Sequence, residues 1–85
     1  MPVHQSRLIC LEVVRLLRKE REGRGLSKYA LANMSGVSQQ MLGYMEKEMR
    51  NPTLETLLKI AYALEIDLGA FIQRAEKNIP RRPKK

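Results

Sequence analysis

Hydrophobic positions along this chain recur every three or four residues, and no stretch keeps up an alternation of apolar and polar residues. The first spacing is typical of an amphipathic helix, whereas a persistent alternation would indicate a half-buried strand. The helical spacing covers residues 6–22, 27–48 and 53–77, and the second and third of these ranges each divide into two helices. We therefore predict an all-α fold, in which residues 1–78 form a single compact five-helix bundle.

Small polar residues and helix breakers mark the ends of the predicted helices. A serine, threonine or aspartate side chain can accept a hydrogen bond from the free N–H groups at the start of a helix. Gly25 follows the first helix and can adopt the left-handed conformation of a helix end. Pro52 restricts Asn51 to extended conformations, so a loop is predicted between the third and fourth helices. The predicted capping residues of the last four helices are Ser27, Ser38, Thr53 and Asp67.

The second and third predicted helices are short and are joined by a tight turn, which is the helix-turn-helix pattern. Gly36 lies in the turn and can take the positive φ that a tight turn often needs. Ala30 is small enough for the third helix to cross closely over the second. Val37 and Leu42 are apolar where the two helices must hold each other. The third helix then projects from the surface and is narrow enough to enter a DNA major groove.

The chain of 85 residues carries 16 Lys or Arg against 9 Asp or Glu, a formal net charge of +7. Such an excess favours a polyanionic partner, either nucleic acid or an anionic membrane surface, although solubility explains it equally well. Residues 26–52 hold only three basic and two acidic side chains, whereas residues 79–85 hold four basic ones. We predict that 79–85 is a basic disordered tail, which either lies along DNA phosphates or serves only as a solubilising end.

The residues that several functional classes require are missing from this sequence. His4 is the single histidine and Cys10 the single cysteine, so the chain has neither an internal disulfide nor a zinc-ligand set. No catalytic constellation or phosphate loop is evident, so we expect no enzyme activity, no cofactor and no small-molecule ligand. The apolar runs fall far below the roughly 20 residues of a membrane span. We expect a cytoplasmic protein without a membrane partner, in which Cys10 packs in the first helix.

One ungapped run, residues 26–72, contains a succession of short motifs. They read Leu26-Ser27-Lys28-Tyr29-Ala30-Leu31-Ala32, Gly36-Val37-Ser38, Met45-Glu46, Arg50-Asn51-Pro52-Thr53-Leu54 and Leu57-Leu58-Lys59-Ile60-Ala61-Tyr62-Ala63-Leu64. This run resembles the Cro and phage-repressor type of helix-turn-helix domain, also called XRE-like. The resemblance implies a lambda-repressor-like five-helix fold and a homodimer that binds double-stranded operator DNA. It also implies a sequence-specific transcriptional regulator of prokaryotic or phage type.

Three features depart from the usual pattern of that family. Lys28 stands where a glutamine often follows the serine that opens helix two, and a lysine reaches a phosphate as a point charge. Glu48 stands where a glycine usually ends the recognition helix, so we expect this helix to continue or to end less sharply. The family pairs an arginine near the end of helix one with a glutamate, here Glu46. Distance from the next helix selects Arg21, but the apolar residues before the arginine select Arg18, which we favour.

The resemblance places the start of the third helix against the edges of the bases. A glutamine amide donates and accepts together, which matches N6 and N7 of adenine. Each candidate also has an ordinary explanation: glutamines are common on helix surfaces, Gly43 can be packed against a neighbour, and Tyr44 can be a half-buried aromatic. The expected base contacts are Gln39, Gln40, Gly43 and Tyr44.

Contacts to phosphates are expected from residues at helix starts and in the loop after the third helix, where they would set the register of the protein on DNA. Taken singly, each basic side chain among them is equally well explained as a solvated surface charge. The expected phosphate contacts are Lys28, Ser38, Lys47, Arg50 and Asn51.

The last helix is the expected dimer interface, because a single small domain offers few base contacts and usually acts as a pair. The alternative is that one face of this helix closes the core of the single chain. A second functional hypothesis is an antitoxin-type protein, which would bind DNA and also a partner protein through the C-terminal tail. The expected interface residues are Ile66, Leu68, Phe71 and Ile72.

Overall fold

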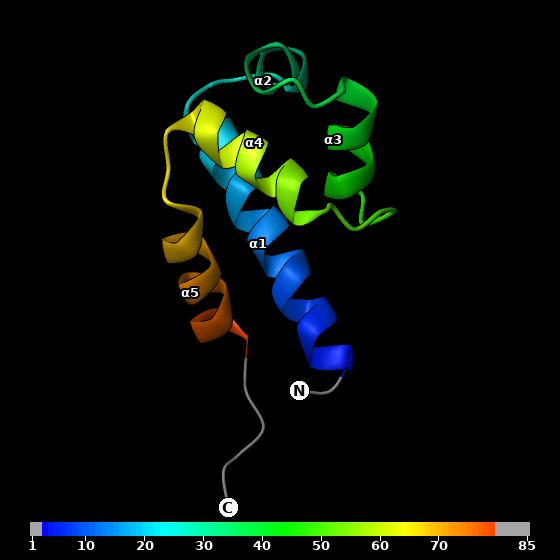
Figure 1. Cartoon of the computed structure of the whole chain (residues 1–85), viewed down its shortest axis with the longest axis vertical. Coiled ribbons are helices and arrows are strands. Elements are labelled where there is room, and N and C mark those ends of the chain that lie inside the picture. The colour runs from blue at the N-terminus through cyan, green and yellow to red at the C-terminus, as the bar shows by residue number, and fades with distance from the viewer. Residues whose placement is uncertain (1–2, 80–85) are drawn as a thin grey trace, which may run out of the picture.

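The computed structural model describes residues 3–79, and these residues form five α-helices and no strand (Figure 1). α1 spans Val3–Gly23 and is followed by two short helices, α2 (Lys28–Ser35) and α3 (Gln39–Glu46). α4 (Leu54–Leu64) and α5 (Leu68–Asn78) come last. The predicted all-α, five-helix fold is confirmed, although α1 begins at residue 3 rather than at residue 6.

The predicted capping residues hold the starts of α2 to α5. The Oγ atoms of Ser27 and Ser38 each accept a hydrogen bond of 3.0 Å from the backbone N–H three residues further on. Thr53 and Asp67 do the same for α4 and α5, at 3.1 and 3.3 Å. Each bond satisfies one N–H group that has no partner within its helix. The start of α3, where base contacts are expected, is therefore fixed by its own sequence.

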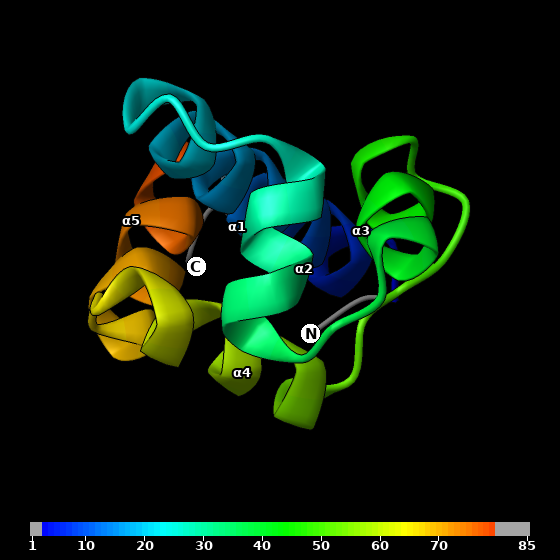
Figure 2. The ribbon, with the colours of Figure 1, turned by 90° about the horizontal axis from the view of Figure 1, so that it is seen from above.

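α1 runs along the long axis of the molecule, with α5 packed beside it and α4 crossing in front (Figure 1). α2 lies at one end and packs against both α3 and α4, while α3 stands to one side (Figure 2). Leu42, Ile60 and Leu64 are fully buried at the centre. The rest of the core is Ile9, Val13, Val14, Leu16, Leu17, Leu31, Val37, Met45, Ala61, Leu68, Phe71 and Ala75.

A polar contact joins the middle of α1 to the end of α5. Glu12 accepts hydrogen bonds from Nε and Nη2 of Arg15 at 2.8 and 2.7 Å, and from Nδ2 of Asn78 at 2.8 Å. The bonds from Arg15, helped by that from Asn78, hold the pKa of Glu12 below its ordinary value, although burial acts in the opposite direction. Because Glu12 is buried, its charge depends on these partners.

Two expectations about apolar and tail residues are wrong. Ile79, placed in the disordered tail, packs half-buried against the core, and its N–H bonds the carbonyl oxygen of Ala75 at 3.1 Å. The other residues of that predicted tail, 80–85, lie outside the described residues. Cys10 is exposed on α1, because its neighbours on the helix, Ile9 and Val13, take the face that meets the core. On α4, the apolar side chains of Leu54 and Leu58 are exposed as well.

Candidate nucleic-acid interface

The turn between α2 and α3 is held by apolar side chains, as the sequence predicted. Leu31, Val37 and Leu42 are all buried where the two helices meet. Gly36 ends α2 with a φ of +77°, and its N–H bonds the carbonyl oxygen of Ala32 at 2.9 Å. A residue with a Cβ would be strained there. The geometry of the turn therefore fixes the direction in which α3 leaves the body of the protein.

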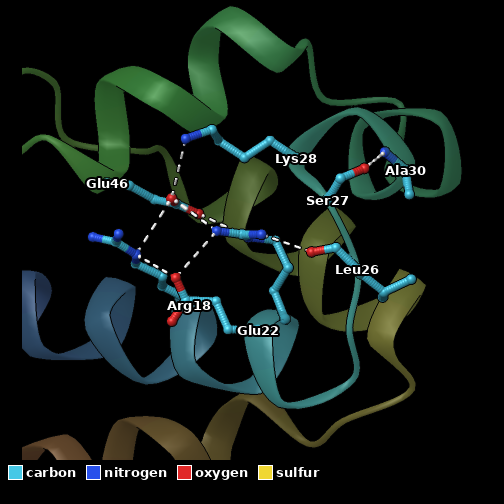
Figure 3. A network of polar contacts seen from close by, with 8 residues as sticks. Arg18, Glu22, Leu26, Ser27, Lys28, Ala30 and Glu46 are labelled. Carbon is cyan, nitrogen blue, oxygen red and sulfur yellow. Dashed lines mark hydrogen bonds and ion pairs between the residues drawn. The ribbon is translucent and has the colours of Figure 1, made fainter.

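A buried ion pair joins the end of α1 to the end of α3 (Figure 3). Nε and Nη2 of Arg21 donate to the two carboxylate oxygens of Glu46 at 3.1 and 3.2 Å. Nη1 of Arg21 donates to the carbonyl oxygen of Leu26 at 2.6 Å, in the segment that leads into α2. Side chains of Arg21 and Glu46 are only 9% and 8% exposed. One guanidinium group thus holds α1, the approach to α2 and the end of α3 together in a bidentate geometry.

Arg18, the favoured partner of Glu46, forms only a longer ion pair with it, and Arg21 makes the hydrogen bonds. Nε of Arg18 lies 3.6 Å from Glu46 Oε1 but donates its hydrogen bond to Glu22 at 3.1 Å, and its side chain is 48% exposed. Arg21 lies in the last turn of α1, which brings it closer to the end of α3. Nζ of Lys28 also lies 3.8 Å from the carboxylate of Glu46, so three cations surround one acidic side chain.

The end of α3 corrects a second expectation. The helix stops at Glu46, and Glu48 takes a φ of +61° in the place where the resemblance led us to look for a glycine. The N–H of Glu48 bonds the carbonyl oxygen of Met45 at 3.0 Å, and the N–H of Met49 bonds that of Tyr44 at 2.8 Å. This pair of bonds is the Schellman motif, which ends a helix abruptly. Glu48 therefore does the work of the glycine, at the steric cost of a left-handed residue that has a Cβ.

The outer face of α3 carries the expected base contacts. Gln39 and Gln40 are exposed, and Tyr44 is half-buried. Nε2 of Gln40 donates a hydrogen bond to the hydroxyl oxygen of Tyr44 at 2.8 Å. The guanidinium of Arg50, in the loop after α3, lies 5.3 Å from the centre of the Tyr44 ring, within reach of a cation–π contact. The structure thus brings Gln40, Tyr44 and Arg50 together, with Gln39 beside them on the same helix.

Gly43 occupies the middle of α3 without a packing reason for being a glycine. A Cβ built at this position would have no neighbouring atom within 4 Å, apart from the helix's own backbone. Glycine costs about 1 kcal/mol relative to alanine in a helix interior. Packing against a neighbour within the chain, the ordinary explanation, is therefore not supported by the described residues.

The expected phosphate contacts lie around the two ends of α3. Ser38 caps the start of the helix, and Lys47, Arg50 and Asn51 are exposed just after its end. Lys28 differs from the others, because it is half-buried and points toward Glu46 (Figure 3). All five remain predictions, and Lys28 has a competing partner of opposite charge in Glu46.

Sequence reasoning missed two residues beside this surface. Nη2 of Arg7, near the start of α1, reaches the carbonyl oxygen of Glu48 at 3.5 Å, so the first helix approaches the loop after α3. No local signal links residues 41 positions apart. Tyr29, in the first turn of α2, is 64% exposed next to Lys28. Tyr29 could have been named from the sequence, because it is an aromatic residue at the start of the predicted second helix.

The expected dimer interface on α5 is largely used up by the single chain. Leu68 and Phe71 are buried in the core, where they pack under α1 and α4, so that part of the expectation is wrong. Ile66 and Ile72 are half-buried against the same core. Leu68 and Phe71 therefore follow the alternative hypothesis, in which one face of this helix closes the core of the single chain.

Within residues 3–79 no cluster of three or more His, Cys, Asp or Glu side chains is placed to hold a metal ion. None of the described helices combines the length and the apolar character needed to cross a membrane.

Two short helices joined by the turn at Gly36, with a polar outer face on the second, define a helix-turn-helix protein. The sequence model of the helix-turn-helix family matches residues 17–71, well over half of the chain. The chain therefore belongs to this family, and the resemblance seen in the sequence is confirmed.

Two curated relatives support the assignment. The chain is 39% identical over 64 residues to the HTH-type transcriptional regulator SutR of Escherichia coli (strain K12), which covers 75% of this chain and 36% of the relative. It is 42% identical over 48 residues to an uncharacterized HTH-type transcriptional regulator of Haemophilus influenzae, covering 56% of this chain and 49% of the relative. The chain thus spans about a third to a half of the length of these relatives. No solved structure matches it significantly.

Proposed function

We propose that this chain is a DNA-binding transcriptional regulator, which reads a specific duplex sequence through α3 and acts as a homodimer on a two-fold operator. The observation that carries the proposal is the outer face of α3, where exposed amides stand on a helix that is fixed at both ends. Ser38 caps its start and the buried Arg21–Glu46 pair anchors its end. A rigid helix places its side chains against base edges with little entropy left to lose.

Gln39 and Gln40 are the proposed base readers. Each exposed amide offers one acceptor and two donor hydrogens, which is the complement of adenine in the major groove. A good bidentate pair is worth about 1–3 kcal/mol of discrimination against the wrong base. Because charged side chains are absent from this short stretch, the selectivity would come from hydrogen bonding and shape.

Phosphate contacts would come from both ends of α3 and from the start of α2. Lys47, Arg50 and Asn51 are exposed on one side of the proposed reading face, and Ser38 lies at the other end of the helix. Lys28 would exchange its 3.8 Å contact with Glu46 for a phosphate oxygen. Such contacts position the protein without reading sequence, and they make binding depend on salt.

The test is a selection of bound duplexes from a random library, followed by competition against bulk DNA. We expect a palindromic winner with half-sites about one helical turn apart, because two copies related by a two-fold axis read inverted sequences. Gln39→Ala should relax preference at one position per half-site, at a cost of about 1–3 kcal/mol there. Gln73→Ala, an exposed glutamine on α5, is the matched control and should change nothing. The proposal fails if no sequence outcompetes bulk DNA.

The salt dependence separates phosphate contacts from base contacts. Lys28→Ala should weaken binding to all duplexes alike and lower the slope of log affinity against log salt by about 1. Lys77→Ala, at the exposed end of α5, is the control with the same loss of charge. Equal slopes for the two variants would remove Lys28 from the set of phosphate contacts.

A further inference from the structure

Large apolar side chains gather on the outer side of α4 and on the end of α2 that lies against it. Leu54, Leu58 and Tyr62 are 63%, 49% and 88% exposed, and Met34 on α2 is 50% exposed. The three residues on α4 are spaced by four, which places them in one row along the helix surface. We call these four residues the α4 row.

The α4 row borders a hollow in the surface. Three members of the row, Met34, Leu58 and Tyr62, line it. The other lining residues are Ser35, Glu55, Lys59 and Ala63. A tyrosine that is 88% exposed and a leucine that is 63% exposed gain little from packing within the single chain. A contiguous apolar surface of this kind, rimmed by charges, is typical of an interaction site.

We propose that a second copy of this chain docks on the α4 row, with the two α4 helices antiparallel about a two-fold axis near Leu58. The inference rests on the dimeric part of the proposed function and moves its interface from α5 to α4. It fits the burial pattern, because the chain uses Leu68 and Phe71 for its own core and leaves the α4 row uncovered.

The charges beside the row favour this arrangement of two copies. Glu55 and Lys59 lie on the same side of α4, with Oε2 and Nζ 3.8 Å apart and side chains 80% and 49% exposed. In an antiparallel pair, Glu55 of each copy approaches Lys59 of the partner subunit, which forms two ion pairs by symmetry. In a parallel pair the two-fold axis runs along the helices and carries Glu55 and Lys59 of the two copies to opposite flanks, so these ion pairs would not form.

The same two-fold axis also matches the apolar side chains. With Leu58 facing its own copy, Leu54 falls opposite Tyr62 of the partner subunit, because antiparallel rows pair positions that are equidistant from the axis. Each small aliphatic side chain therefore meets a large aromatic one. Met34 is the one member of the row that lies on α2, and it lines the same hollow as Leu58 and Tyr62.

The row leaves the proposed reading face of α3 uncovered. α3 and α4 are separate elements joined by the loop after α3, and α3 stands to one side of the α4 helix in both views (Figures 1 and 2). From Leu54 to Tyr62 the row is only about 12 Å long, since a helix rises 1.5 Å per residue. An interface this small is at the weak end of the range, so DNA carrying two half-sites should strengthen it.

Sedimentation equilibrium of the full chain, over a series of protein concentrations, tests the proposal. We expect the 9.8-kDa chain to associate reversibly to twice its mass. Leu58→Lys should abolish this association, because it sets two ammonium groups against each other at the axis. Tyr29→Lys removes a large side chain that is 64% exposed outside the row and should leave the association unchanged. Helical circular dichroism and a thermal melt establish that each variant is folded.

A mixing experiment tests the antiparallel charge pairing itself. Glu55→Lys alone and Lys59→Glu alone should each associate more weakly than the unaltered chain, because each places like charges across the axis. An equimolar mixture of the two variants should recover dimer, since the cation of one then meets the anion of the other. If the mixture of the two variants does not form dimer, the antiparallel pairing is wrong.

The remaining outcomes separate this proposal from the DNA-binding one. If Ile72→Lys dissociates the dimer while Leu58→Lys does not, the interface lies on α5 and the α4 row is rejected. If the chain stays monomeric both free and on a duplex with two half-sites, self-association through the row is rejected. Selection of a specific sequence in that case would still uphold the reading role of α3, because a single copy binds one half-site.

Discussion

The amide of Gln40 donates a 2.8 Å hydrogen bond to the hydroxyl of Tyr44, one turn further along the same helix. The bond uses one of the two amide hydrogens and leaves the carbonyl oxygen of Gln40 free for an outside donor. The guanidinium of Arg50 lies over the ring of Tyr44, 5.3 Å from its centre, so the hydroxyl that accepts from the amide belongs to a ring with a contact of its own. We therefore expect Tyr44 to position Gln40 as well as to be a candidate contact of its own.

Tyr44→Phe should weaken base discrimination at the position read by Gln40, because it removes the hydroxyl and leaves the ring in place. A typical hydrogen bond is worth about 1 kcal/mol, which corresponds to a roughly fivefold loss in the affinity ratio between right and wrong bases. The measurement is competition between duplexes that differ only at that base pair.

The double variant supplies the control for this prediction. In a Gln40→Ala background, Tyr44→Phe should have no further effect at that base pair, since the amide it positions is gone. Additive losses in the two single variants would mean that the Tyr44 hydroxyl touches DNA by itself.

Gly43→Ala should change stability and DNA binding in opposite directions. A Cβ at this position meets no neighbouring atom within 4 Å, so alanine should raise the free energy of unfolding by about 1 kcal/mol. If the backbone of α3 approaches the bases closely here, the added methyl group will clash with DNA and lower the affinity. Urea unfolding and fluorescence anisotropy with a labelled operator measure the two effects. Unchanged or tighter DNA binding by this variant would show that Gly43 faces open space in the complex as well.

Arg21→Ala should destabilise the protein far more than Arg18→Ala. Removal of Arg21 leaves the buried carboxylate of Glu46 without its bidentate partner, which costs about 3–5 kcal/mol. Arg18 is 48% exposed and holds Glu22 mainly in a surface pair, which is worth about 0–1 kcal/mol. Urea unfolding, followed by helical circular dichroism, compares the two variants. Similar midpoints for both would mean that Arg18 takes over the role of Arg21.

The local features of this chain could be predicted from its sequence because each depends on neighbours along the chain. Ser27, Ser38, Thr53 and Asp67 cap helices that begin at the next residue, and Gly36 ends α2 as its freedom of φ suggests. Helix periodicity gave the number of helices for the same reason.

Features that depend on how helices meet in space were harder to predict. The choice between Arg18 and Arg21 depends on where the end of α1 lies relative to α3. Matching the apolar residues selected Arg18, which makes the longer of the two ion pairs with Glu46. Phe71 and Leu58 are both apolar residues of amphipathic helices, yet the first is buried and the second half-exposed. The packing of helices against one another decides this, because α1 covers the side of α5 that holds Phe71, whereas α2 and α5 pack against α4 and leave Leu58 exposed.

The stability of the fold should fall in acid partly through Glu12. Hydrogen bonds from Arg15 and Asn78 keep its pKa in the folded state below the value of about 4.3 that an unfolded glutamate has. The unfolded chain therefore binds this proton at a higher pH than the folded one. The stabilisation is complete above the unfolded pKa and is lost as the pH falls through the folded pKa.

Glu12→Gln, which keeps the shape but carries no charge, should flatten the decline of unfolding free energy below about pH 5. Glu65→Gln, at the exposed end of α4, is the matched control. Parallel pH profiles of the unaltered protein and Glu12→Gln would show that this carboxylate does not couple α1 to α5 through its charge.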